Sequence, residues 1–242
     1  MKYLLMLPLF VLFFLPNTQA QKWWNGGVDG SGPRVEKDLQ LDQFSGIRLS
    51  INADVYLTQG STQSVRISAQ QNIIDLIETR VEGNIWKIKT EENIDDHAPI
   101  KIYITVPRMT YVKLSGSGDI YTENTFTGND AVEVGISGSG DLRFKTTANS
   151  IEAAISGSGD IELDGSTENL NISISGSGDI DAKELVSGNC EVRISGSGGA
   201  KVHATKNLNV RVSGSGDVYY KGSPNVQSRV SGSGDLQSIS GR

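Results

Sequence analysis

Hydrophobic and polar residues alternate along most of this chain. Between residues 170 and 182 the even positions are Leu, Ile, Ile, Gly, Gly, Ile and Ala, and the odd positions are Asn, Ser or Asp. A period of two is typical of a β-strand with one face in a core. The same alternation runs through residues 46–59 and 100–106. The pattern therefore predicts an all-β protein, in which only residues 72–81 fit a helical turn as well as a strand.

A tetrapeptide, Ser-Gly-Ser-Gly, recurs through the second half of the chain at steps of 18 to 22 residues. A period near twenty without a helical pattern indicates a β-solenoid, in which each repeat forms one coil. The seven copies begin at Ser115, Ser137, Ser156, Ser175, Ser195, Ser213 and Ser231.

The glycines of this motif predict a corner in each coil. Thirteen extended residues would span about 43 Å at about 3.3 Å each, which is too long for one wall of so short a coil. Glycine accepts unusual backbone angles and leaves the inside of a bend uncrowded. A glycine in a strand is unfavourable by about 0.5–1 kcal/mol relative to alanine. We expect hydrogen bonds between stacked coils to offset that loss.

Stacking also predicts which side chains become neighbours. It places Arg143 beside Glu162 and Asp181 beside Lys201, two favourable pairs of charges on adjacent strands. Cys190 falls in an apolar column and is expected to be a buried filler, not a nucleophile. The other members of that column are Ile151, Leu170 and Leu208.

The N-terminal end of the chain predicts export. Residues 1–20 combine Lys2, an apolar run and a small-residue exit, as a secretory signal peptide does. Residues 21–40 are expected to be a leader or linker, and 41–238 the solenoid domain, with a less regular β part over 41–110 and the SGSGD coils over 111–238. The destination is the periplasm, the cell surface or the outside of the cell, with no transmembrane span in the mature chain.

The formal net charge of −6 argues against nucleic acid and anionic membranes as partners.

The chain also resembles a known family. The stretches "FSGIRLSINADVYLTQGSTQSVRISA" and "IKIYITVPRMTYVKLSGSGDI", followed by the later SGSGD copies, are similar to the bacterial domain of unknown function called the putative auto-transporter adhesin, head GIN domain. The resemblance covers roughly residues 41–236. It implies a right-handed parallel β-helix in an exported protein of the cell envelope, and it supplies no catalytic residues.

An aspartate column after each corner is the first candidate site. Stacked carboxylates and serines near glycine turns could hold Ca²⁺, but the nine-residue period of calcium-binding β-rolls is absent. Like charges about 4.8 Å apart repel by only about 0.9 kcal/mol in water, so a solvated column without metal is the preferred interpretation. Its members are Asp119, Asp141, Asp160, Asp179, Asp217 and Asp235, with Gly199 interrupting the series.

An outward column of arginines is the second candidate site. Arg193, Arg211 and Arg229 occupy equivalent positions and could bind an acidic polymer. The aspartate and arginine columns together form the expected ligand-binding face for a glycan or an envelope protein. We expect no catalytic residues, because repeats of this length leave no insertion for a catalytic cleft. We also expect no metal site and no cofactor, because the aspartate column lacks the spacing of calcium-binding repeats.

The function expected from these patterns is a non-enzymatic, adhesin-like binding or scaffold module in the cell envelope. Two alternatives stay open: a polysaccharide-active β-helix enzyme, and a structural module stabilised by calcium. The last motif lies close to the C-terminus, so the final coil has little sequence left to cover it. Exposed solenoid edges favour pairing with another chain, and end-to-end self-association is therefore a further hypothesis.

Overall fold

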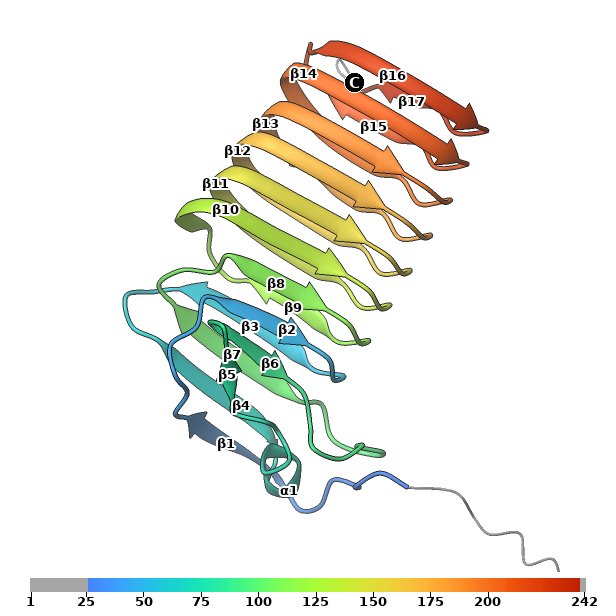
Figure 1. Ribbon diagram of the computed structural model, residues 1–242. Helices are drawn as coiled ribbons and strands as arrows, with labels where there is room; N and C mark the ends of the chain where they lie inside the picture. Colours follow the sequence, from blue (N-terminus) through green and yellow to red (C-terminus); the bar gives the residue numbers. More distant parts are fainter. Residues whose placement is uncertain (1–25, 240–242) are drawn as a thin grey trace, which may run out of the picture.

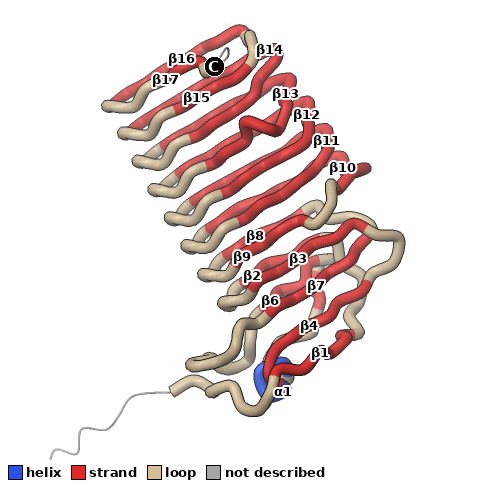
Figure 2. The backbone as a smooth tube through the Cα atoms, turned by 180° about the vertical axis from the view of Figure 1, so that it is seen from behind, coloured by secondary structure: helices blue, strands red, loops and turns tan. Residues whose placement is uncertain are grey.

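Parallel strands stacked in two facing walls make up almost the whole protein (Figure 1). The computed structural model describes residues 26–239. The predicted signal peptide, residues 1–20, lies outside the described residues. The predicted all-β solenoid is confirmed, and the motif corners form one straight edge along it (Figure 2).

The second half of the chain forms the regular coils. Its strands are β8 (Tyr111–Leu114), β9 (Asp119–Thr122), β10 (Phe126–Ile136), β11 (Leu142–Ile155), β12 (Ile161–Ile174), β13 (Ile180–Ile194), β14 (Ala200–Gly214), β15 (Val218–Lys221), β16 (Asn225–Gly232) and β17 (Leu236–Ser238). We call the wall of residues before each motif wall A, and the wall of residues after it wall B. Each long strand from β11 to β14 begins in wall B, bends, and ends in wall A, where it pairs in parallel with the coils on either side.

The first half of the chain contributes the remaining elements. They are β1 (Arg34–Leu39), β2 (Gly46–Leu49), β3 (Asp54–Gln59), β4 (Ser64–Gln70), α1 (Gln71–Ile74), β5 (Val81–Glu82), β6 (Ile85–Ile88) and β7 (Lys101–Val106). Residues 72–81 therefore begin in a helical turn, α1, which is one of the two outcomes that the sequence allowed.

The first half continues the same two walls, but not in chain order. In wall A, β2 lies between β6 and β8 and is parallel to both. In wall B, β3 lies between β7 and β9 and is parallel to both. The chain thus lays down its second coil first, goes back to form the outermost coil, and then passes over to β8 (Figure 1).

An antiparallel cap covers the N-terminal end of the solenoid. β4 pairs antiparallel with β7, and β1 pairs antiparallel with β4. The expectation of a leader or linker over 21–40 is therefore wrong for residues 34–39. Val35 and Leu39 pack against the core, while Arg66 of β4 binds Asp38 of β1 at 3.0 Å. Such a cap protects strand edges that would otherwise pair with other chains.

Inward columns of aliphatic residues fill the space between the walls. Cys190 is 4% exposed and lies in register with Leu170 on one side and Leu208 on the other. Its burial among apolar neighbours raises the pKa of its thiol to about 12. The prediction of an unreactive core cysteine agrees with this placement.

The predicted outward ion pairs are also present. Arg143 Nε lies 3.2 Å from Glu162 Oε2, and Lys201 Nζ lies 3.8 Å from Asp181 Oδ2. Lys183 lies closer to the same Asp181 oxygen, at 2.6 Å. All these side chains are at least a quarter exposed, so the pairs support the register more than they stabilise the fold.

The motif glycines are required by the closeness of stacked corners. A Cβ on Gly157 or Gly176 would lie closer than 3.0 Å to the carbonyl oxygen of the glycine one coil earlier. That oxygen accepts the inter-coil hydrogen bonds: Gly157 O, for instance, accepts from Ser177 N at 3.1 Å. Left-handed backbone angles occur at only two motif glycines, Gly214 (φ 146°) and Gly232 (φ 138°). The space that a side chain would take, more than unusual backbone angles, therefore explains the repeated glycine.

Candidate ligand-binding groove

One outward column of wall A varies in charge and size along the solenoid. It lies two residues before each motif, and pairing between adjacent strands keeps its members in register. In spatial order from the cap, the column reads Arg48, Lys113, Gly135, Ala154, Ser173, Arg193, Arg211 and Arg229. Small residues therefore occupy three consecutive coils, with basic residues on both sides of them.

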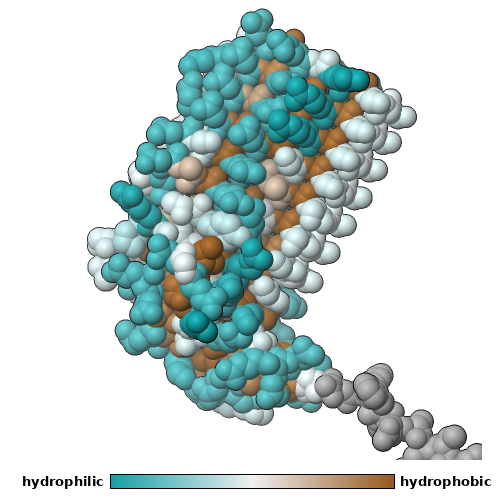
Figure 3. All heavy atoms as spheres, viewed as in Figure 1, coloured by the Kyte–Doolittle hydropathy of each residue, from teal (hydrophilic) through white to brown (hydrophobic). Residues whose placement is uncertain are grey.

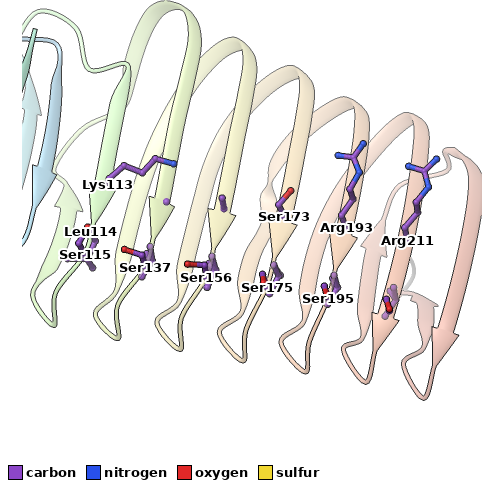
Figure 4. A pocket seen from close by; sticks show the side chains of 18 of the residues that line it. Lys113, Leu114, Ser115, Ser137, Ser156, Ser173, Ser175, Arg193, Ser195 and Arg211 are labelled. Atoms are coloured by element: carbon purple, nitrogen blue, oxygen red, sulfur yellow. The ribbon is translucent and has the colours of Figure 1, made fainter. Parts of the chain in front are cut away.

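This column forms the floor of a groove of about 770 Å³ that runs along the solenoid. The first serine of each motif forms one side of the groove, as Figure 4 shows for Ser137 and Ser156. Between these serines and the more polar middle of wall A, a hydrophobic stripe follows the stack (Figure 3). The stripe comes from the residue before each motif, whose side chain belongs to the core and shows the groove only its outer edge, at most 3% exposed: Leu114, Ile136, Ile155, Ile174, Ile194 and Val212.

The small residues give the groove its depth. Gly135, Ala154 and Ser173 place at most two side-chain heavy atoms above the sheet. Lys113 leans over the next coil (Figure 4), and a Cβ on Gly135 would lie 2.7 Å from its Nζ. The groove is therefore open over β11 and β12, whereas Lys113 covers part of β10 and long arginine side chains narrow the groove from β13 onward.

The residues that line the groove include five cations and no carboxylate. Two carboxylates on its border offset part of this charge. Glu133 binds Lys113 at 2.7 Å, and one oxygen of Glu191 binds both Arg193, at 2.6 Å, and Arg211, at 2.7 Å. The groove remains positive after this compensation, although the whole chain is acidic.

The two ends of the groove differ in available charge. At the cap end, Lys113 is only 19% exposed and already has a carboxylate partner, and Arg48 donates to the hydroxyl of Tyr111 at 2.7 Å. At the other end, Arg193 and Arg211 are each about half exposed and share one carboxylate. Within residues 26–239, no carboxylate lies within salt-bridge distance of Arg229. The C-terminal end is thus the more accessible anion-binding end.

The structure separates the two predicted columns of the ligand-binding face. Arg193, Arg211 and Arg229 line the groove. The aspartates lie on the far side of the corner, outside it. Four of them accept a hydrogen bond from the backbone N–H of the next aspartate: Asp119 from Asp141 at 2.9 Å, Asp141 from Asp160 at 3.4 Å, Asp160 from Asp179 at 2.9 Å, and Asp217 from Asp235 at 2.8 Å.

The aspartate column therefore connects one coil to the next. Asp179 bonds in the same way to the N–H of Gly199 at 2.6 Å, and Gly199 has no carboxylate to continue the series. Asp119 has a second partner, the hydroxyl of Tyr121 at 3.0 Å. Burial, with this carboxylate beside it, raises the pKa of Tyr121 to about 12. Across residues 26–239, no three His, Cys, Asp or Glu side chains are arranged to hold a metal ion.

Sequence reasoning found the arginine end of the groove and missed the remainder. Arg48 lies outside the repeats, so the repeat pattern does not point to it. The position two residues before each motif draws attention by its charge only where it holds arginine. Reading that position through all seven repeats would have shown Lys, Gly, Ala and Ser before the three arginines, a pattern that indicates a hollow between charges.

Comparisons with known proteins agree with this architecture. Among solved structures, the chain is similar to a putative adhesin from Bacteroides fragilis, with 26% identity and a TM-score of 0.83 over 88% of this chain and 100% of that one. It also resembles a protein from Parabacteroides distasonis described as a putative lipid binding protein, with 22% identity and a TM-score of 0.73 over 88% of this chain and 99% of that one. A putative adhesin from the same species has 24% identity and a TM-score of 0.71 over 88% of this chain and 99% of that one. At these lower identities the likeness shows the fold alone.

Among curated proteins, none matches this chain. No helix within the described residues is both long and apolar enough to cross a membrane. The family described as "putative auto-transporter adhesin, head GIN domain" matches residues 43–224, three quarters of the chain. The chain therefore belongs to this head GIN domain family.

Proposed function

We propose that this chain is an exported, non-enzymatic binding module of the bacterial cell envelope, and that it holds an elongated, anionic ligand in the groove of wall A. The observation that carries the proposal is a continuous groove whose lining residues include five cations and no carboxylate. Its volume of about 770 Å³ is within the range of small-molecule sites, about 300–1,000 Å³.

The shape of the groove supports an extended ligand. It runs across the strands from β2 to β16, eight strands in wall A. Seven spacings of about 4.8 Å give a length of about 34 Å. A rigid stack of hydrogen-bonded coils holds this surface in place without a ligand, which reduces the entropy lost on binding.

The chemistry of the lining residues supports binding more than catalysis. General acid–base catalysis near neutral pH uses carboxylates or histidines, and glycoside hydrolysis uses a pair of carboxylates. Serine, arginine, lysine and aliphatic residues line this groove. The aspartates that could supply acids are on the other side of the corner and bond to backbone N–H groups. Export rests on the predicted signal peptide, and the adhesin-like role agrees with the family description.

A direct binding screen tests the proposal. The purified chain would be applied to an array of acidic and neutral glycans and to a panel of anionic and neutral lipids. The variant Ala154→Phe fills the middle of the groove. Lys145→Phe adds the same side chain at an exposed position of the same strand in wall B and serves as the matched control.

Selective binding that is lost in Ala154→Phe and kept in Lys145→Phe would support the groove as the binding site. Selective binding that survives in Ala154→Phe would place the site elsewhere and refute the proposal. A chain that binds nothing on either array would also count against it.

A further inference from the structure

The groove combines an apolar floor with a positive end, and this combination selects a class of ligand. We propose that it binds the single acyl chain of a free anionic amphiphile, with the chain along β10–β12 and the head group at Arg193 and Arg211. This inference rests on the proposed binding function of the groove and names the ligand for it.

The floor favours hydrocarbon over a polar polymer. Seven of the groove-lining residues are aliphatic, and none is aromatic. Over β10–β12 the groove is lined by Gly135, Ala154 and Ser173 and by the outer edges of three isoleucines that are each at most 3% exposed, Ile136, Ile155 and Ile174. This surface has no aromatic ring on which a sugar could stack, and its hydroxyl groups are confined to Ser173 and to the serines along one side. It gains free energy mainly from covering apolar area.

The uncharged part of the groove has the length of an acyl chain. Lys113 and Arg193 are separated by four strand spacings in wall A, or about 19 Å at about 4.8 Å each. Lys113 leans inward and shortens the open part (Figure 4). The hydrocarbon core of a bilayer is about 30 Å thick, so one acyl chain extends about 15 Å. A single chain therefore fits between the two charged ends.

The distribution of charge sets the direction of the ligand. Three arginines and one glutamate at the C-terminal end leave two positive charges, and the arginines are about half exposed. At the cap end, Lys113 is mostly buried and its charge is matched by Glu133, so Arg48, which donates to the Tyr111 hydroxyl, leaves one positive charge there. Two guanidinium groups in adjacent coils can donate parallel hydrogen bonds to a carboxylate or a phosphate. The head group is accordingly placed at Arg193 and Arg211, and the tail points toward the cap.

Calorimetric titration with dodecanoate, decanoate and octanoate below their micellar concentrations tests this assignment. If the groove binds the acyl chain, the affinity should fall about two- to fourfold for each methylene group removed. From dodecanoate to octanoate the affinity should then fall at least about tenfold. Dodecyl maltoside, with the same tail and an uncharged head, should bind at least tenfold more weakly than dodecanoate. Equal affinity across the chain lengths would overturn the proposal.

Variants locate the tail and the head separately. Ala154→Phe should abolish dodecanoate binding, whereas Lys145→Phe should not change it. The double change Arg193→Gln and Arg211→Gln should weaken dodecanoate at least tenfold and leave dodecyl maltoside unchanged. Arg143→Gln, an outward arginine of wall B paired with Glu162, is the control for lost positive charge. Dodecanoate binding that survives in Ala154→Phe would refute the assignment.

Two further experiments distinguish failure of this ligand assignment from failure of the proposed binding function. Cosedimentation with phosphatidylglycerol–phosphatidylcholine vesicles, without binding of monomeric dodecanoate, would indicate docking on a membrane surface and overturn the single-chain proposal. Binding of an acidic oligosaccharide that is lost in Ala154→Phe, again without dodecanoate binding, would refute the amphiphile and keep the groove as a site. Failure of every ligand would refute both proposals.

Discussion

Replacing one corner glycine by alanine tests whether close stacking holds the solenoid together. We choose Gly176→Ala, in the middle of the regular coils. The new Cβ would lie closer than 3.0 Å to Gly157 O. That oxygen accepts hydrogen bonds from Ser177 N at 3.1 Å and Gly178 N at 3.3 Å. The two corners must separate to relieve the clash, and both hydrogen bonds then weaken.

The magnitude follows from these contacts. Two backbone hydrogen bonds contribute about 0.5–1.5 kcal/mol each, and residual overpacking adds about 1–3 kcal/mol. Reduced freedom of the unfolded chain offsets about 0.4–1 kcal/mol. These ranges together allow a net loss of about 1–6 kcal/mol in the free energy of unfolding, and we take the middle of that range, about 2–4 kcal/mol, as the expected value. For a chain of this size each 1 kcal/mol lowers Tm by about 2–4 °C, so we expect a decrease of roughly 4–16 °C.

Thermal unfolding followed by circular dichroism measures this shift. Gly199→Ala is the matched control, because its Cβ would lie 3.2 Å from Asp217 O and 3.3 Å from Asp179 Oδ1 and needs only a small adjustment. We expect the control to change stability by less than about 1 kcal/mol. A Gly176→Ala protein that melts within 2 °C of the control would show that the reasoning about stacked corners is wrong.

Four smaller predictions follow from the same contacts. Asp160→Ala removes the acceptor for Asp179 N and should lower the free energy of unfolding by about 0.5–1 kcal/mol, whereas Asp160→Asn, which keeps an acceptor, should melt close to wild type. Adding EDTA should leave Tm unchanged, and a decrease reversed by Ca²⁺ would revive the calcium-stabilised alternative. Cys190, whose thiol pKa is raised to about 12, should resist a thiol reagent at pH 8 until denaturant is added. β16 is exposed along its length, with Val226 39% and Val230 38% exposed, so this end of the solenoid can pair with a second copy. We expect the mass measured by light scattering to rise with protein concentration. A mass that stays that of a monomer at high concentration would refute end-to-end association.

The regular half of the fold was predictable because one repeat explains all the others. Aligning the copies of the motif fixes the register near each corner, and the register places Arg143 beside Glu162 and Cys190 beside Leu170. Parity then assigns each residue to the core or to the outside. No knowledge of distant contacts is needed when every contact is with the preceding or following coil.

The cap could not be derived in the same way. Alternation identifies 46–59 and 100–106 as strands, but it says nothing about which coil lies next to which. That order depends on β2 and β3 lying between earlier and later coils, a contact between segments distant in sequence. β1 was missed because its six residues, RVEKDL, are mostly charged and resemble a linker. Their pairing with β4 stabilises a strand that local preference does not favour.

The groove was only half predictable because its depth is a property of side-chain size across several coils. Alternation shows that Gly135, Ala154 and Ser173 face outward, but one small outward residue in a single strand does not indicate a groove. The hollow exists only because three small residues stack in consecutive coils between longer ones.

The stack constrains the positions of a coil unequally, and the groove occupies the position that it constrains least. Inward residues must be apolar, motif glycines must leave room for a neighbouring carbonyl, and the aspartate column supplies acceptors to the next coil. Two residues before the motif, the side chain faces outward and the backbone is already paired on both sides. Arginine, lysine, serine, alanine and glycine all fit there. The fold therefore leaves the chemistry of this column open, and this is why we place the ligand on it and not on the more regular aspartate column.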